Sequence, residues 1–330
     1  MTSGTGIVLG VDAGGTATRA LALGPDGSVL GSGLAGGGNP NSHRPEHAAE
    51  AIAEAMTAAL AGLDAAAVRA CVIGMAGASK LTDPAVADLF RRAWDDLGLP
   101  APPRVASDAE AAFASATSAP DGTVLIAGTG SIAGRIRARR MVSTAGGYGW
   151  LLGDEGSGFW IGREAVRSAL DALAGHAPLG ALARAVLVEA LGEVGTENAG
   201  DTTGRRQLAY RLITAANAAP PVRLSRFAPL VSTASVAGDP AAQEIVRTAA
   251  RWLTETAMAT REPGERTPVV LVGSVLGRDS PVGTLVRESL AGPEVLESRD
   301  GVLGAAWLAA VDAFGEHAPR PVAGSGAGVP

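Results

Sequence analysis

The chain is short of cysteine and of long apolar runs. Its 330 residues include a single cysteine, Cys71, which excludes an internal disulfide. Cys71 lies in an apolar run that predicts a strand, where a buried core thiol is the favoured interpretation. No apolar run approaches the roughly 18 residues of a membrane-spanning helix. Residues 1–6 also lack the basic and apolar regions of a signal peptide. We therefore expect a cytoplasmic protein.

Lysine is almost absent, and its one occurrence excludes a large class of ATP-binding protein. Lys80 is the single lysine among 27 lysine and arginine residues. A P-loop needs a lysine directly after a glycine and before serine or threonine, whereas Lys80 stands between Ser79 and Leu81. The sequence therefore excludes a P-loop NTPase, and no lysine beside a glycine turn is available to clamp phosphate.

An excess of positive charge and a histidine cluster are also missing. The net charge of −6 and the isoelectric point near 5.3 argue against nucleic acid or an anionic membrane as the main partner. His43, His47, His176 and His317 show no metal-ligand spacing with Cys71, and the H-E-x-x-H motif is absent. We therefore expect neither a nucleic acid nor a membrane as the main partner, and no metal site built from histidine.

Two glycine turns are the strongest positive feature. The segment from Asp12 to Thr16 follows the apolar run 7–11, and the segment from Gly128 to Ser131 follows the apolar run 123–127. Glycine lets a backbone approach an anion closely, and its N–H groups can cradle phosphate. Two such turns predict an ATP-using enzyme with two similar halves that grips one phosphate chain from both sides. The predicted ATP contacts in these turns are Gly14, Gly15, Thr16, Gly128, Thr129, Gly130 and Ser131.

Asp12 ends the strand before the first turn, where a carboxylate can hold a water of hydrated Mg²⁺. A hairpin turn with a solvated aspartate is the alternative. The second turn also fits the dinucleotide fingerprint G-x-G-x-x-A through Ala133, but that fingerprint needs a helix directly after the turn. Residues 132–137 alternate like a strand instead, which favours phosphate contact by a hairpin.

The predicted elements recur in the same order along the chain, which predicts an α/β fold with two domains. We expect an N-terminal domain over 1–118, a C-terminal domain over 119–314, and a flexible tail over 315–330. Helices at about 159–261 form an insertion in the second domain. The predicted strands are 6–11, 17–23, 29–34, 68–75, 104–107, 123–127, 132–138, 141–145, 269–272 and 295–297. The predicted helices outside the insertion are 44–63, 84–97, 109–116, 282–291 and 301–314.

Asp108 terminates the predicted strand 104–107. A carboxylate at the C-terminal end of a strand, facing a crevice between domains, suits a general base. The alternative is an N-cap for the following helix, because aspartate is a good cap. The sequence leaves both interpretations open.

The segment from Gly146 to Ser157 carries the densest local signal, with glycines and two aromatics followed by the acids Asp154 and Glu155. Acids together with backbone amides suit a polyol, whose hydroxyls need donors and acceptors. A capping loop in which Asp154 or Ser157 starts a helix is the alternative. Farther along, Gly273-Ser274 ends an apolar strand, where it is either an adenine or ribose contact or an ordinary β–α turn.

Taken together, these stretches resemble the sugar kinase, Hsp70 and actin superfamily, and more narrowly the N-acetylglucosamine kinase and BadF/BcrA-type ATPase family. The resemblance covers roughly residues 6–310, through D-x-G-G-T, S-D-A, G-T-G-S, G-G-Y-G-W-L-L-G-D-E-G-S and V-G-S in that order. It implies two ribonuclease H-like (actin-like ATPase) domains with an interdomain cleft and a helical insertion in the second. It also implies ATP and Mg²⁺ as cofactors and a homodimer.

The resemblance implies a role for each matching residue. Asp108 matches the catalytic aspartate, which takes the proton from the sugar 6-hydroxyl, and Asp12 places Mg²⁺ through water. The two glycine turns match the phosphate turns, and Gly273-Ser274 matches the adenosine-binding turn. The implied substrate contacts are Asn39, Gly77, Asp108, Thr129, Gly149, Asp154 and Glu155.

Two departures from the family bear on the substrate. Animal-type N-acetylglucosamine kinases carry a tryptophan close after the loop asparagine, but here Pro40-Asn41 follow Asn39, and the serine before their glycine loop is Ala76. Actinobacterial glucosamine kinases are similar in size and in their Ala/Arg-rich composition, and Glu155 near a C2 ammonium would favour the amine. We therefore predict a kinase that converts glucosamine to glucosamine 6-phosphate. N-acetylglucosamine kinase is the alternative, and a non-sugar BadF-type ATPase is a further one.

Overall fold

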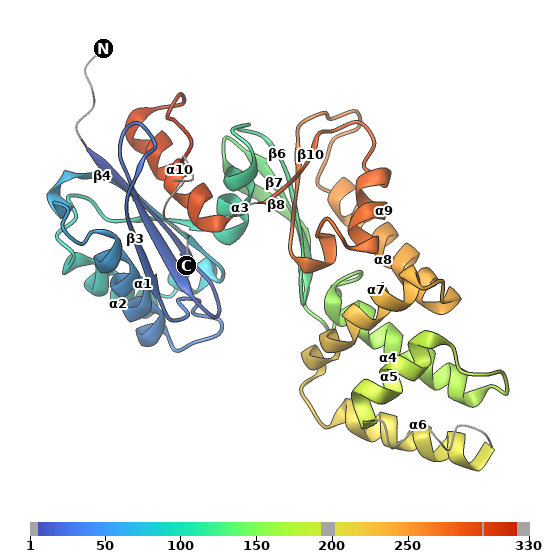
Figure 1. Cartoon of the computed structure of the whole chain (residues 1–330). Helices are drawn as coiled ribbons and strands as arrows, with labels where there is room; N and C mark the ends of the chain where they lie inside the picture. Colours follow the sequence, from blue (N-terminus) through green and yellow to red (C-terminus); the bar gives the residue numbers. More distant parts are fainter. Residues whose placement is uncertain (1–5, 193–201, 299, 322–330) are drawn as a thin grey trace. The chain divides into compact units, whose positions relative to one another are not determined.

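The computed structural model of the chain describes residues 6–192, 202–298 and 300–321. Contacts divide the chain into two compact units. Unit 1 takes its described residues from Met1–Gly122, Ile136–Val142 and Leu296–Pro330, and unit 2 takes them from Thr123–Arg135 and Ser143–Val295. The fold has two five-stranded sheets with helices (Figure 1), which confirms the predicted α/β class.

The sheet of unit 1 has the strand order β3-β2-β1-β4-β5. β1 (Ile7–Ala13), β2 (Thr18–Leu23) and β3 (Val29–Ala35) form an antiparallel meander, and β4 (Val68–Met75) and β5 (Arg104–Ser107) continue the sheet in parallel from β1. β1 and β4 are apolar and largely buried, as strands covered on both faces should be. Cys71 is buried in β4, and burial raises the pKa of its thiol, so the core-thiol interpretation is confirmed.

Three parallel strands end at the same edge of this sheet. Ala13 of β1 is paired with Met75 of β4, and Met75 is paired with Ser107 of β5. The segments that leave these strands therefore start side by side. They carry the first glycine turn, Gly77 and Asp108, so the sheet brings three distant candidate segments to one edge.

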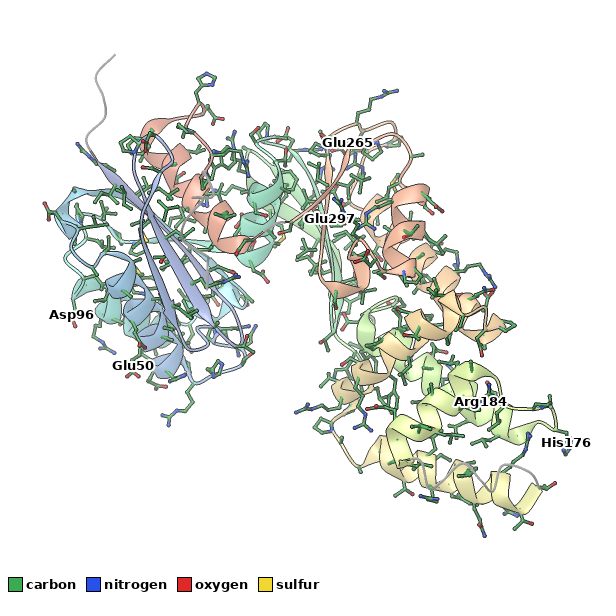
Figure 2. The ribbon with its side chains drawn as sticks, in the orientation of Figure 1. Glu50, Asp96, His176, Arg184, Glu265 and Glu297 are labelled. Atoms are coloured by element: carbon green, nitrogen blue, oxygen red, sulfur yellow. The ribbon has the colours of Figure 1, made fainter. Side chains whose placement is uncertain are left out.

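Helices cover both faces of the first sheet (Figure 1). α1 (Pro45–Ala59) packs on β2 and β3, and α2 (Pro84–Asp95) packs on α1. α3 (Asp108–Ala116) and α10 (Gly301–Phe314) cover the other face and pack against each other. Charged side chains such as Glu50 of α1 lie on the exposed side of this layer (Figure 2).

α10 is the last helix among the described residues, yet it belongs to unit 1. A Cβ on Gly10 of β1 would overlap the backbone of Ala306, so only glycine allows α10 to pack this closely. The sequence division at 118/119 placed this helix in the second domain, and the contacts group it with the first sheet instead. The physical reason is its nearly uniform apolar surface, which needs cover on most sides. Its buried residues are Val302, Gly304, Ala305, Ala306, Trp307, Leu308, Ala309 and Ala310.

Ala318 and Arg320 hold the described residues after α10 against unit 1, although we expected a flexible tail over 315–330. Ala318 is buried, and its carbonyl accepts a hydrogen bond from Nε1 of Trp307 at 3.1 Å. Arg320 donates to the carbonyls of Ala114 and Ser115 at the end of α3. Residues 322–330 of the expected tail lie outside the described residues.

The second sheet has the order β10-β9-β6-β7-β8. β6 (Gly122–Ala127) pairs in parallel with β9 (Val269–Val272) and neighbours β7 (Ser131–Arg137), while β8 (Arg140–Gly146) and β10 (Val295–Glu297) are the edge strands. Taken from the β8 edge, this order repeats the order of the first sheet. The recurrence of elements that the sequence predicted is therefore present as a repeated sheet topology.

Five α-helices lie between β8 and β9 in the described residues, where the sequence predicted helices at about 159–261. Residues 193–201 of that stretch lie outside the described residues. α9 follows β9, over Pro281–Ser289. None of the described helices is long and apolar enough to cross a membrane. The five helices are α4 (Gly158–Ala174), α5 (Ala181–Leu191), α6 (Thr202–Asn217), α7 (Ala228–Val236) and α8 (Pro240–Met258).

Candidate functional site

The first glycine turn is a tight hairpin between β1 and β2. The Gly14 amide donates to the carbonyl of Ala17 at 3.0 Å, and the Gly14 carbonyl accepts from the amides of Gly38 and Asn39 at 3.1 Å each. Gly15 and Thr16 are exposed. The turn is therefore fixed through Gly14, while its tip is open to a ligand.

His43 also supports this turn, and sequence reasoning missed that role. A ring nitrogen of His43 lies 2.7 Å from the carbonyl oxygen of Gly15. Its ring also packs against His47, with ring centroids 5.3 Å apart. The local sequence gave no signal for this contact, because it joins residues 28 positions apart.

Asp12 is part of a charged network that sequence reasoning did not foresee. Arg19 of β2 donates to Oδ2 of Asp12 at 2.7 Å and to Oδ2 of Asp300 at 2.8 Å. Burial raises the pKa of Asp12, and the hydrogen bond and charge of Arg19 partly offset that rise. A Cβ on Gly301 would lie 2.8 Å from Cγ of Asp12, so the carboxylate packs directly against the start of α10.

The carboxylate of Asp12, held in place by Arg19, is a candidate to hold a water of a hydrated Mg²⁺ ion. Mg²⁺ usually keeps several waters and takes only one or two carboxylates besides phosphate oxygens, so a preformed ring of ligands is not needed. Within the described ranges 6–192, 202–298 and 300–321, no group of three or more His, Cys, Asp and Glu is arranged to hold a metal. His176, for example, stands beyond the end of α4 (Figure 2).

Asp108 is the first residue of α3, but it does not cap this helix. The N-cap is Ser107, whose hydroxyl accepts from the amide of Glu110 at 3.1 Å. The capping alternative for Asp108 is therefore wrong. Its Oδ1 accepts from the amide of Ala109 at 2.9 Å, and the residue is exposed to solvent.

Although Asp108 is exposed, desolvation by nearby protein atoms raises the pKa of its carboxyl group. The amide of Ala109 opposes the rise, and the negative charge of Glu110 adds to it. An accessible carboxylate with a raised pKa and no capping role has the properties of a general base.

Asn39 and Gly77 lie close together in unit 1. Oδ1 of Asn39 accepts from the amide of Asn41 at 2.8 Å, which folds the loop after Asn39 into a turn. Gly77 has a φ of 80°, and a Cβ there would lie 2.5 Å from Nδ2 of Asn41. Glycine is therefore required at position 77, and the two predicted sugar contacts belong to one loop cluster.

The second glycine turn is held by the residues that start α4. The amide of Gly158 donates to the carbonyl of Gly128 at 2.7 Å, and the amide of Phe159 donates to that of Thr129 at 3.1 Å. The Ser131 hydroxyl donates to the carbonyl of Glu155 at 3.1 Å. The glycine-rich segment and the second turn thus form one structure within unit 2.

Asp154 lies at the centre of that structure. It is only 8% exposed, has a φ of 61°, and accepts from the amide of Ser131 at 3.3 Å. Burial raises its pKa, the Ser131 amide lowers it, and the charge of Glu155 raises it further. Ser157, rather than Asp154, caps α4, through a bond from the Trp160 amide.

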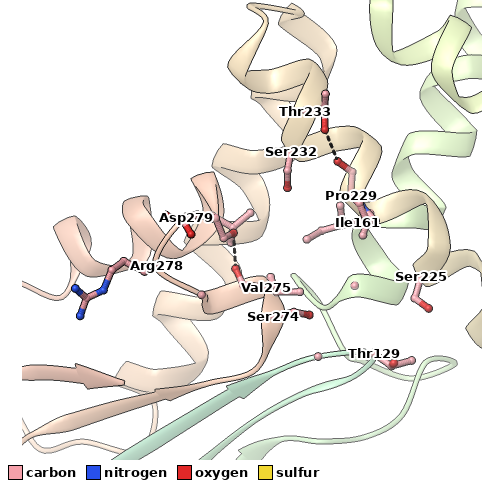
Figure 3. A pocket seen from close by; sticks show the side chains of 16 residues that line it. Thr129, Ile161, Ser225, Pro229, Ser232, Thr233, Ser274, Val275, Arg278 and Asp279 are labelled. Carbon is pink, nitrogen blue, oxygen red and sulfur yellow. Dashed lines mark hydrogen bonds between the residues drawn. The ribbon is translucent and has the colours of Figure 1, made fainter. Parts of the chain in front are cut away.

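A cavity of about 620 Å³ opens beside the second turn (Figure 3). Gly128 and Thr129 line it from the turn, and Ser274 lines it from the end of β9. Gly273 has a φ of 97°, and its position against the backbone of Ala127 would leave no room for a Cβ. The predicted phosphate and adenosine turns are therefore neighbours in unit 2. The lining residues that the sequence did not suggest include Ser225, Ser232, Thr233, Arg278 and Asp279.

These features define a class of protein: a repeated α/β topology in which a glycine turn follows the first strand of each sheet is the fold of actin-like ATPases and sugar kinases. Within that class, the chain belongs to the BadF/BadG/BcrA/BcrD ATPase family, whose profile matches residues 9–309. The sequence resemblance to this family is therefore confirmed.

Named relatives agree with this placement. The chain is 34% identical over 166 residues to the N-acetylmuramic acid/N-acetylglucosamine kinase of Clostridium acetobutylicum, which covers 49% of this chain and 53% of that protein. It thus spans about half the length of the curated relative that it matches.

Two solved structures extend the comparison over nearly the whole chain. A candidate N-acetylglucosamine kinase from Chromobacterium violaceum aligns with a TM-score of 0.67 and 26% identity, covering 92% of this chain and 98% of that one. A candidate N-acetylglucosamine kinase from Porphyromonas gingivalis shares the fold, with a TM-score of 0.62, 24% identity and the same coverage of 92% and 98%.

Proposed function

We propose that this protein is an ATP-dependent amino-sugar kinase that converts glucosamine and ATP to glucosamine 6-phosphate and ADP. The observation that carries the proposal is the 620 Å³ cavity lined by Gly128, Thr129 and Ser274. A nucleoside triphosphate needs phosphate-binding groups directly beside a space for its base and ribose. This cavity supports the proposal because it brings the second glycine turn and Ser274 to one space. The names of the relatives support a sugar as the acceptor.

Asp108 is the proposed general base. Its carboxylate takes the proton of the sugar 6-hydroxyl while O6 forms a bond to the γ-phosphorus. The bond between that phosphorus and the β–γ bridging oxygen breaks, and ADP leaves with the bond's electron pair. The support is structural, because Ser107 already caps α3 and leaves Asp108 free for this task.

Asp12 is the proposed partner of hydrated Mg²⁺. Gly15, at the open tip of the turn, is a proposed phosphate contact through its amide, and Gly14 is one through the close approach that glycine allows. Mg²⁺, when bound, neutralises charge that builds on the transferring phosphoryl group. The chain's own contribution is to hold the Asp12 carboxylate in place through Arg19 and Gly301. Gly130, Ser131 and Thr16 complete the proposed ATP contacts, together with Gly273 of the adenosine turn.

Sugar contacts are proposed for two clusters, one in each unit. In unit 1, Asn39 and Gly77 lie in one loop cluster next to the strand edge that bears Asp108. In unit 2, Thr129, Gly149, Asp154 and Glu155 belong to the second turn and its supporting segment. Carboxylates and amides of this kind suit hydroxyl and ammonium groups of an amino sugar.

The choice of glucosamine rests on Pro40-Asn41 and Ala76, which stand where animal-type relatives have a tryptophan and a serine. Exposed Glu155 is a proposed partner for the C2 ammonium. N-acetylglucosamine kinase is the second candidate, favoured by the names of the relatives. We also propose that two copies of the chain form a homodimer.

ADP release tests the proposal directly. Glucosamine, N-acetylglucosamine, N-acetylmannosamine and glucose are offered separately with Mg²⁺ and ATP. We expect the highest kcat/KM with glucosamine, and a higher value with N-acetylglucosamine would favour the second candidate. ADP formation that no sugar stimulates would remove the kinase function. Light scattering coupled to size exclusion measures the mass of the assembly, for which we expect twice the 32.8 kDa of the chain.

A further inference from the structure

Glu110 is a buried carboxylate that the proposed reaction does not use. It is 8% exposed, although it lies in the first turn of α3, where acidic side chains usually face solvent. It stands two residues after Asp108 in the chain. A buried acid so close to the proposed base needs a physical account.

Both oxygens of the Glu110 carboxylate are engaged. Oε2 accepts from the amide of Ser107 at 2.6 Å and lies 3.2 Å from its hydroxyl. Oε1 accepts from the amide of Met141 in β8 at 2.8 Å. A capping box uses only the first of these bonds. The second joins the start of α3 to a strand more than 30 residues farther along the chain.

We propose that Glu110 is a positioning residue for Asp108: it fixes the backbone on both sides of Asp108 and anchors the first turn of α3 to Met141. Asp108 lies inside the box formed by Ser107 and Glu110, so any movement of that box moves the base. The inference rests on the proposed function, in which Asp108 accepts the proton of the sugar hydroxyl. A small displacement of a base lowers turnover steeply.

Glu110 also acts on Asp108 through charge. Its carboxylate adds to the rise that desolvation by nearby protein atoms produces in the pKa of Asp108. The other charged groups at this end of the sheet are Asp12 on β1, Arg19 on β2 and Asp300 at the start of α10. Further charged groups lie on the elements that pack around α3. They are Arg69 on β4, Lys80 before α2, Arg104 on β5, its partner Asp312 on α10, Arg140 on β8, and Arg320.

Three variants separate geometry, charge and simple capping. Glu110→Gln keeps the shape of the side chain but removes its charge and one of its two acceptor oxygens. Glu110→Asp keeps the charge, but it is one methylene too short to reach both Ser107 and Met141. Ser107→Ala removes the hydroxyl cap and leaves the Glu110 carboxylate in place.

We expect kcat to fall roughly tenfold to a hundredfold in Glu110→Gln and Glu110→Asp, and to stay within about threefold of wild type in Ser107→Ala. The acid limb of the kcat profile moves to lower pH in Glu110→Gln alone, because loss of the neighbouring negative charge lowers the pKa of Asp108. Ser107→Ala loses thermal stability without that move.

Two measurements need no turnover. NMR titration of the Asp108 carboxyl carbon reports its pKa, which we expect to fall in Glu110→Gln and to stay unchanged in Ser107→Ala. Hydrogen exchange reports the Met141 amide, which we expect to exchange at least tenfold faster in both Glu110 variants. Absence of sugar-dependent ADP formation in wild type would remove the kinase function, and these two measurements would still decide whether Glu110 holds Asp108.

The proposal is overturned if Glu110→Gln and Glu110→Asp leave the Met141 amide as protected as in wild type. It is also overturned if Ser107→Ala reproduces their loss of kcat, because capping of α3 would then explain the whole effect. If Glu110→Gln does not fold, Glu110→Asp carries the exchange and kinetic tests.

Discussion

The two glycine turns share a sequence pattern but are held by different structures. In unit 1, loop amides of Gly38 and Asn39 donate to the carbonyl of Gly14. In unit 2, the donor is instead the first amide of the 17-residue helix α4: Gly158 donates to the carbonyl of Gly128. An irregular loop supports the first turn, and a regular helix supports the second.

The two regions also differ in their chemistry: acidic side chains lie near the first turn, and a cavity lies beside the second. Asp12 and Asp108 stand near the first turn, and desolvation by neighbouring protein atoms raises the pKa of each. The second turn borders the 620 Å³ cavity. We therefore propose that the same motif serves charge chemistry in unit 1 and nucleotide shape in unit 2. Charge changes in unit 1 should therefore alter turnover, and shape changes in unit 2 should alter nucleotide affinity.

Asp108→Asn is expected to have the largest effect. We expect kcat to fall ~10²–10⁴-fold, because the base is lost, while calorimetry shows an unchanged Kd for ATP. In wild type, we expect turnover to fall as the pH drops through the raised pKa of Asp108, so the acid limb should lie at higher pH than for an unperturbed aspartate. A parallel loss of ATP affinity in the variant would contradict the inference that unit 1 determines turnover and unit 2 determines nucleotide affinity.

The same variant has a stability prediction. A carboxyl whose folded-state pKa is raised stabilises the fold less as the pH rises from its unfolded-state pKa through its folded-state pKa. Asparagine carries no charge, so Asp108→Asn should be at least as thermally stable as wild type at neutral pH. A clearly lower melting temperature in a pH 7 scan would show that the Asp108 carboxylate has a structural role.

Arg19→Gln tests the charged network of unit 1. It leaves Asp12 and Asp300 without their shared guanidinium, and we expect a loss of about 2 kcal/mol in the free energy of unfolding. Without Arg19 the folded-state pKa of Asp12 rises further. The loss of unfolding free energy in the variant is therefore largest at neutral pH and shrinks as the pH falls through that pKa. Urea titrations at several pH values measure the unfolding free energies of the variant and of wild type. Arg104→Gln is the matched control, since its partner Asp312 is 38% exposed, and the expected loss is below about 1 kcal/mol.

Gly128→Ala tests the shape of unit 2. A Cβ at Gly128 meets nothing within 4 Å, so the fold should tolerate it. A phosphate chain beside that backbone would not, and we expect a KM for ATP ~10-fold higher, or ~1.4 kcal/mol, with an unchanged melting temperature. Gly130→Ala, in contrast, should lower the melting temperature, because its Cβ would lie 2.8 Å from Oδ2 of buried Asp154. Equal KM values for Gly128→Ala and wild type would place the phosphates elsewhere.

Local patterns in the sequence predicted most of the candidate site. Glycine after an apolar strand and a polar residue at a strand end are decided within a few residues, so both turns and Asp108 were visible. Ser107 and Glu110 also form the S-x-x-E pattern of a capping box, so the sequence contained the signal that Ser107 is the cap.

Contacts between distant residues were not visible in the same way. Arg19 and Asp300 meet across 281 positions, and their contact depends on α10 packing against β1. Neither residue carries a local pattern that points to the other. The same packing explains why the last helix joins the first unit, which no periodicity of the helix itself reveals.

Ser157→Ala should have the smallest effect, and it tests whether the helix that supports the second turn also positions it. The Ser157 hydroxyl accepts from the Trp160 amide at 3.2 Å and caps α4, the helix that holds the second turn. We expect a loss of about 1 kcal/mol in unfolding free energy, measured in urea, and a roughly threefold higher KM for ATP, equivalent to about 0.6 kcal/mol. Asp83→Ala is the matched control: Asp83 caps α2 in unit 1, so its loss should lower stability to a similar extent and leave the KM for ATP unchanged. If both variants leave the KM unchanged, α4 stabilises unit 2 without positioning its glycine turn, and the two turns differ less than their supports suggest.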